Sequence, residues 1–85
     1  MSSDEQSQTP APAPLEPLDA ALRVLREEDR ALHWTAIQDL ALKRGYLDPF
    51  VQRNIRQRLV AALATAAKDG MVVRESTGVY ALPSG

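Results

Sequence analysis

The chain contains no cysteine, and this absence limits how so short a sequence can be held in a fold. Within its 85 residues there can be no disulfide framework, no thiolate nucleophile and no cysteine-based zinc site. One histidine cannot build a multi-histidine metal centre either. We therefore expect one small domain that folds by hydrophobic packing alone, with no metal and no cofactor, and the 45% hydrophobic and 25% charged composition is typical of such a domain.

The same inventory argues against catalysis and against a membrane span. Every serine lies near a chain end or in the segment 75–78, so the sequence offers almost no residues that could form a nucleophile with a neighbouring base. No apolar run approaches the roughly 20 residues that a membrane span needs. The amino terminus, MSSDEQSQTP, has neither the basic region nor the apolar stretch of a signal peptide. We expect a cytoplasmic protein with no catalytic residues.

The first sixteen residues differ in composition from the rest. Four of the six prolines fall within the first seventeen positions, beside serine, glutamine and acidic residues. This composition predicts a disordered, acidic, proline-rich tail over residues 1–16 and a folded domain over residues 17–83. From Leu18 onward ten basic residues face eight acidic ones, a net charge of +2, and five of the ten lie between Lys43 and Arg58 with one acid.

Two amphipathic segments are predicted to form the first two helices. In residues 17–28, Pro17 suits the first helical position, and the apolar spacing is helical at Leu18, Ala21, Leu22 and Leu25. Residues 30–35 form a short strand or an extended linker. Thr35 and Gln38 have the spacing of a capping box, so the second helix is predicted to start at Thr35 and to end at Gly45, with a buried stripe of Ile37, Leu40 and Ala41.

The third predicted helix is the longest element. Asp48 followed by Pro49 is the pattern of an N-cap carboxylate and a first helical residue. An apolar series then continues until Gly70 ends the helix: Val51, Ile55, Leu59, Ala62, Leu63 and Ala66. The common core of the three helices is predicted to contain Leu25, Ile37, Leu40, Ile55 and Leu59. The turn between the second and third helices is expected to close this core with Tyr46, Leu47 and Phe50, and the alternative is that these three form a partner-binding patch.

Two short runs rich in β-branched residues end the domain. Residues 71–74 and 79–82 flank the turn 75–78, which predicts a β-hairpin. A two-stranded hairpin is marginal alone, so a third strand from the segment around His33 is expected to join it. The order helix, strand, helix, helix, hairpin predicts a mainly α fold with a small antiparallel sheet (α+β), arranged as a winged helix-turn-helix.

Several short motifs carry a family resemblance over residues 18–82. They are Ala21-Leu22-x-Val24-Leu25, Leu32-His33-Trp34-x-x-Ile37, Ala41-x-x-Arg44-Gly45, Gly70-Met-Val-Val-Arg74 and Gly78-Val79-Tyr80-Ala81-Leu82. This pattern resembles the HARE-HTH family, the winged-helix module found in chromatin regulators, restriction endonucleases and the RNA polymerase delta subunit. The resemblance implies DNA binding or docking on transcription machinery. Together with eight arginines against two lysines and frequent alanine, it favours a bacterial transcription-associated or accessory factor, located at the nucleoid.

The third helix carries the candidate DNA-reading residues. In helix-turn-helix proteins the amino-terminal end of the second motif helix enters the major groove, where arginine pairs with guanine and asparagine or glutamine with adenine. The residues predicted to face base edges of duplex DNA are Arg53, Asn54, Arg56 and Gln57. Those predicted to contact phosphates at the flank are Lys43, Arg44 and Arg58. The alternative is a solvated polar face, since any amphipathic helix needs one and basic residues suit a helix carboxyl end.

The hairpin supplies a second candidate contact. Arg74 can lie along a minor groove or a phosphate, and the hydroxyls of Ser76 and Thr77 can donate to phosphate oxygens. Glu75 in the same tip would repel the DNA backbone, and serine, threonine and glycine are the ordinary residues of any turn. We expect His33 and Trp34 to be a strand residue and a core aromatic, with no chemical role.

A different class of function stays open. The second half of the third helix presents small and apolar residues opposite its core stripe, namely Val60, Ala61, Ala64 and Ala67. Such a face allows another helix to approach closely. The alternative function is therefore a protein-interaction module that docks on RNA polymerase or another assembly without binding DNA, and a homodimer is conceivable.

Overall fold

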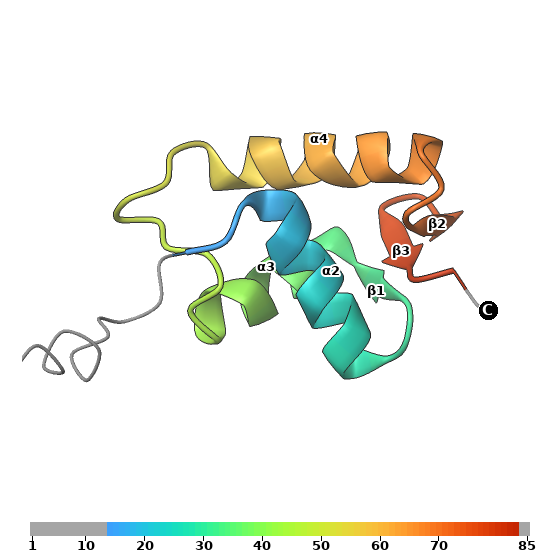
Figure 1. The fold of residues 1–85 in the computed structure, drawn as a ribbon, viewed down its shortest axis with the longest axis horizontal. Helices are drawn as coiled ribbons and strands as arrows, with labels where there is room; N and C mark the ends of the chain where they lie inside the picture. Colours follow the sequence, from blue (N-terminus) through green and yellow to red (C-terminus); the bar gives the residue numbers. More distant parts are fainter. Residues whose placement is uncertain (1–13, 84–85) are drawn as a thin grey trace, which may run out of the picture.

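The computed structural model describes residues 14–83, which form three helices and a three-stranded antiparallel sheet (Figure 1). The elements are α2 (Pro17–Glu28), β1 (Leu32–His33), α3 (Trp34–Lys43), α4 (Ile55–Lys68), β2 (Val73–Ser76) and β3 (Val79–Ala81). This is the predicted order, and the α+β class is confirmed. Within these residues no helix combines the length and the apolar character that crossing a membrane requires.

The predicted tail falls mostly outside the described residues, because its positions 1–13 are not among them. Its last three residues, 14–16, lie against the domain. The Leu15 N–H donates to the carbonyl of Tyr46 at 2.8 Å, and the Gln52 side-chain amide donates to the Leu15 carbonyl at 2.8 Å. The Leu15 side chain packs on the core. The domain therefore begins before Pro17, since both the N–H and the carbonyl of Leu15 are hydrogen-bonded to it.

The sheet has the strand order β1-β3-β2, with all neighbours antiparallel. Leu32 pairs with Tyr80 and His33 with Val79, so the predicted third strand around His33 is confirmed. β2 extends to Ser76, which leaves a tight turn at Thr77 and Gly78. The sheet positions Tyr80, which is 7% exposed, against the helices.

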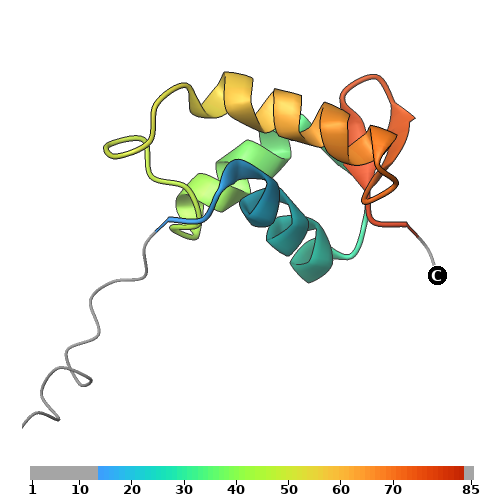
Figure 2. The ribbon, with the colours of Figure 1, turned by 45° about the horizontal axis from the view of Figure 1, so that its top comes forward.

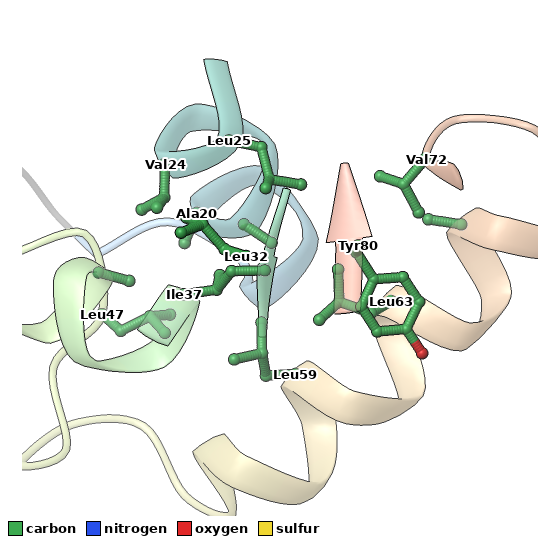
Figure 3. Packing of buried hydrophobic residues seen from close by; sticks show 13 residues of the cluster. Ala20, Val24, Leu25, Leu32, Ile37, Leu47, Leu59, Leu63, Val72 and Tyr80 are labelled. Atoms are coloured by element: carbon green, nitrogen blue, oxygen red, sulfur yellow. The ribbon is translucent and has the colours of Figure 1, made fainter. Parts of the chain in front are cut away.

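The core lies between the three helices and the sheet (Figure 3). Leu25, Ile37 and Leu59 are at most 1% exposed, as predicted, and Leu63 joins them from the next turn of α4. The other two predicted members are only partly buried, so Leu40 and Ile55 pack at the margin of the core. α2 packs against both other helices, which explains why its buried face is wide (Figure 2).

The predicted capping box is wrong. α3 starts one residue earlier, at Trp34, and its N-cap is His33, whose Nδ1 accepts from the Thr35 N–H at 3.2 Å and lies 2.8 Å from the Thr35 hydroxyl. The cause is the sheet, since the Trp34 N–H donates to the Gly78 carbonyl at 2.8 Å and fixes His33 in an extended conformation. Gln38 does not reach back, and its Oε1 is buried with no hydrogen-bond partner among the described residues.

The predicted start of the third helix is also wrong, because α4 begins at Ile55. Asp48 and Pro49 do start a turn. The side-chain carboxylate of Asp48 accepts from the Phe50 N–H at 2.9 Å, and the backbone carbonyl of Asp48 accepts from the Gln52 N–H at 2.9 Å. The turn ends there because the Gln52 side chain bonds to Leu15, and because Asn54 adopts a left-handed conformation (φ 52°).

This later start moves two apolar side chains out of the core. Phe50 is 94% exposed and does not close the core as predicted, and Val51, predicted to begin the apolar series of the third helix, is 66% exposed. The neighbouring prediction is confirmed for Leu47, which is 1% exposed, and Tyr46 packs on the core from its margin.

Candidate nucleic-acid interface

The amino terminus of α4 is open. Its N-cap, Asn54, makes no side-chain hydrogen bond to the helix, and the first turn contains no acidic residue. The first N–H groups of a helix have no partner within the helix, and they carry the positive end of its dipole. This end of α4 therefore offers unshared donors to an anion.

The four residues predicted to read bases gather at this end. Arg56 and Gln57 belong to the first turn of α4, whereas Arg53 and Asn54 lie in the loop before it, and all four are exposed. The structure thus brings the set together but places only two members on the helix. A helical array of four base-reading side chains is not formed, because α4 starts six residues later than Pro49.

Trp34 orients Arg56. The guanidinium carbon of Arg56 lies 5.6 Å from the centre of the Trp34 ring, a distance at which a cation is attracted to the ring face. Both side chains line a shallow hollow of about 420 Å³ together with Gln57, Val60 and Ala61. Trp34 is therefore a half-buried residue that links the core to the outer surface of α4, a role that its position in the sequence did not indicate.

The hairpin turn approaches the same hollow. A methyl group added at Gly78 would lie 3.3 Å from the Trp34 ring and 2.8 Å from Nε2 of His33, so the turn sits directly on these two rings. Of the predicted wing residues, Arg74 and Ser76 lie in β2 and Thr77 lies in the turn, all exposed. Trp34 thus contacts both Arg56 of α4 and the hairpin turn.

The predicted phosphate ligands divide into two kinds. Arg44 is held by two carboxylates, with Nη1 2.7 Å from Glu27 and Nη2 2.6 Å from Glu28, and Arg58 lies 3.4 Å from Glu16. Arg44 therefore ties the carboxyl end of α2 to that of α3. Lys43 and Arg74 are exposed and form no ion pair with any residue in 14–83.

The Arg44 cluster perturbs the ionisation of its members. The hydroxyl of Tyr46 donates a hydrogen bond to Glu27, and this bond is the main cause that lowers the pKa of Glu27. Arg44 lowers this pKa further, whereas partial desolvation raises it. The hydrogen bond from Arg44 is the main cause that lowers the pKa of Glu28. The same Glu27 contact raises the pKa of Tyr46. Sequence reasoning missed this cluster because its members lie 16 to 19 positions apart.

These shifts predict an acid-sensitive contact. A carboxylate whose pKa is lower in the folded chain than its ordinary 4.5 adds stability above that value, and loses the contribution as the pH falls through the lowered pKa. Between about pH 5 and about pH 3, the thermal midpoint of the protein should fall, and the fall should be smaller in Arg44→Met. Calorimetry of both proteins across this range checks it, and equal falls would mean that Arg44 adds nothing to the acid sensitivity.

The outer face of α4 is apolar along part of its length. Val60 is 38% exposed, and Ala61 and Ala64 are exposed as predicted. Ala67 does not belong to this surface, because it is half-buried and packs on the core. The predicted interaction surface is therefore shorter and adjoins the Trp34 hollow.

Comparisons with protein-family models, with curated protein sequences and with solved structures found no match for this chain. The observations that bear on function are therefore the fold and the surface around the start of α4.

Proposed function

We propose that this chain is a winged-helix DNA-binding protein, in which α3 and α4 form the helix-turn-helix and the β2–β3 hairpin is the wing. The observation that carries the proposal is the open amino terminus of α4, with exposed Arg53 and Arg56 beside it and no acidic residue in the first turn. Helix amino termini and arginines are common partners of DNA phosphates. The HARE-HTH resemblance agrees with this proposal and adds a transcription-associated role.

In this proposal the residues of the site have different tasks. A phosphate accepts from the first N–H groups of α4 and from Arg53, which fixes the register of the helix on the duplex. Gln57 extends from the side of α4 opposite the buried Leu59 and suits an adenine edge. The small side chains of Ala61 and Ala64 allow the helix to approach the groove floor and contact thymine methyl groups.

The paired arginines lower the expected affinity. With Arg44 and Arg58 held by carboxylates, we expect two to three phosphate contacts, and log K should fall against log salt with a slope of roughly −2 to −3. A monomer should then bind random-sequence duplex on the order of micromolar at physiological salt, as is usual for non-specific binding.

The test is the affinity of the double variant Arg53→Ala/Arg56→Ala for a random-sequence duplex, measured by fluorescence anisotropy at several salt concentrations. We expect weaker binding and a slope that is shallower by about one to two units. The matched control is the double variant Arg26→Ala/Arg30→Ala, which removes the same charge from the end of α2 and the turn after it. Equal loss in both variants would mean attraction by net charge alone and would refute the assigned site.

A second candidate is supported by the apolar hollow between Trp34, Val60 and Ala61. This surface suits a protein helix, from RNA polymerase, from another assembly or from a second copy of the chain. Val60→Lys should abolish such docking, since it puts a charge in the hollow, while DNA binding is kept. Sedimentation equilibrium of the wild type and the variant tests the homodimer. If the hollow is a dimer interface, the wild type should self-associate and Val60→Lys should not.

A further inference from the structure

Phe50 is the most exposed large apolar side chain among residues 14–83, at 94%. Burying a phenylalanine stabilises a protein, and a ring exposed to water does not make this contribution. Val51 beside it is 66% exposed. Phe50 and Val51 therefore form a small exposed apolar surface that is available to a partner.

The turn that carries the ring is firmly built. The Phe50 N–H donates to the Asp48 carboxylate at 2.9 Å, and the Asp48 N–H donates to the Gln52 side chain at 2.7 Å. The Gln52 side-chain amide in turn donates to the Leu15 carbonyl at 2.8 Å. These bonds fix the backbone on both sides of Phe50, so its ring is presented from a defined position.

The ring borders a hollow of about 420 Å³ whose apolar walls come from Leu42, Leu47 and Pro49. Two charged residues also line it, and both have partners. Asp48 accepts from the Phe50 N–H, and Arg44 is bound to the carboxylates of α2. A flat apolar group can therefore lie against the apolar walls beside Phe50, in a hollow whose Asp48 carboxylate is hydrogen-bonded but has no cationic partner among residues 14–83.

The Asp48 carboxylate next to the ring is bonded to the Phe50 N–H, and the nearest cation along the chain that forms no ion pair within residues 14–83 is Arg53. Arg53 follows Phe50 by three positions, so their Cα atoms lie within about 11 Å of each other. The open amino terminus of α4 comes directly after Arg53. A ligand that covers Phe50 and reaches this end of α4 must combine a flat apolar surface with a negative charge at short spacing.

We infer that Phe50 stacks on an unpaired base of a nucleic acid whose phosphates lie at Arg53 and the start of α4. This inference rests on the proposed DNA-binding function. Nucleic acid alternates flat bases with phosphates, and aromatic side chains stack on any base because every base has a π-face. In fully paired duplex the faces are covered by neighbouring bases, so the favoured target is duplex with an unstacked base, such as a bulge or a junction with a single strand.

The experiment compares two DNAs, a random-sequence duplex and the same duplex with one bulged nucleotide, by anisotropy at low salt. The wild type should bind the bulged DNA at least about five-fold more tightly, the lower end of what one stacked base contributes. Phe50→Trp should keep this preference and show more quenching of indole fluorescence on binding than the wild type, in which Trp34 is the one tryptophan. Phe50→Leu should lose the preference, because leucine keeps an apolar side chain but has no π-face.

The variants separate the possible failures. Both Phe50 variants should fold normally, since the ring is exposed, and circular dichroism checks this. If Phe50→Leu keeps the wild-type preference, or if the wild type has none, the stacking role is overturned, while dependence on Arg53 and Arg56 would leave the proposed function standing. If Arg53→Ala/Arg56→Ala binds both DNAs as tightly as the wild type, the proposed site and the inference fall together.

Discussion

Replacing Leu59 by alanine should lower the free energy of unfolding by about 2–5 kcal/mol. Leu59 is 0% exposed and projects from α4 into the cluster that contains Ile37 and Leu25 (Figure 3). Truncation removes its apolar contacts and leaves a cavity that a tightly packed core fills only in part. Since a domain of this size has only about 5–15 kcal/mol in total, much of the variant should be unfolded near physiological temperature.

The neighbouring residue provides the control for this substitution. Val60 lies on the same turn of α4 but is 38% exposed, so Val60→Ala should cost much less than Leu59→Ala. Urea denaturation followed by circular dichroism measures both variants on the same scale. Equal costs would show that the helix is oriented differently from the structure described above.

The second large effect is expected at Gly78. Its φ is +76°, a conformation that costs an alanine about 1–2 kcal/mol, and an added methyl group would lie 2.8 Å from Nε2 of His33. Relieving this overlap must move the His33 ring, whose Nδ1 accepts from the Thr35 N–H at the start of α3, and loss of such a cap costs about 0.5–2 kcal/mol. Gly78→Ala should therefore destabilise the protein by roughly 1.5–4 kcal/mol.

Gly70 is the matched control, because it has nearly the same φ of +80° with no atom within 4 Å of an added methyl group. Gly70→Ala should lower the free energy of unfolding only by the backbone contribution, about 1–2 kcal/mol. The difference between the two glycine variants in urea denaturation measures the contact of the hairpin turn with the two rings. No difference would mean that the turn does not press on them.

Helical spacing and turn residues predicted most of the fold. The apolar spacing of α2 and the run of β-branched residues in the hairpin specify local structure. α2 forms over the predicted residues 17–28, whereas the first hairpin strand lies two residues later than predicted, at Val73–Ser76. Gly45 and Gly70 follow α3 and α4 with positive φ, as glycines do at helix ends. Leu25, Ile37 and Leu59 were found because burial follows the same periodicity.

The errors have a common physical cause, which is that long-range hydrogen bonds override local signals. The sequence Asp48-Pro49 starts a turn, but the bond from Gln52 to Leu15, 37 positions away, diverts the chain before a helix can continue. The pairing of β1 with β3 makes His33 the N-cap in place of Thr35. Arg44 looked like a phosphate ligand because its partners on α2 are distant in the sequence.

The sequence predicted which residues gather at the candidate site, but it did not predict how they are arranged. Basic and amide side chains before and within the first turn of α4 were expected to share one helix face, but the left-handed Asn54 separates Arg53 from Arg56. The stacking of Arg56 on Trp34 was beyond prediction, since it depends on how α3 and α4 pack. The exposed Phe50 was assigned to the core for the same reason that the helix start was misplaced.

The most direct test of the central claim is a titration of the ¹⁵N-labelled protein with a random-sequence DNA duplex at ~20 mM salt, where screening is weakest. The account predicts that the amide resonances of residues 53–57 move first and furthest, with smaller shifts in the hairpin turn at Thr77 and Gly78. The amide resonances of the Arg44 cluster, which lies at the carboxyl end of α2, should not shift. If no resonance moves, or if the shifts centre on α2, the start of α4 is not a nucleic-acid interface.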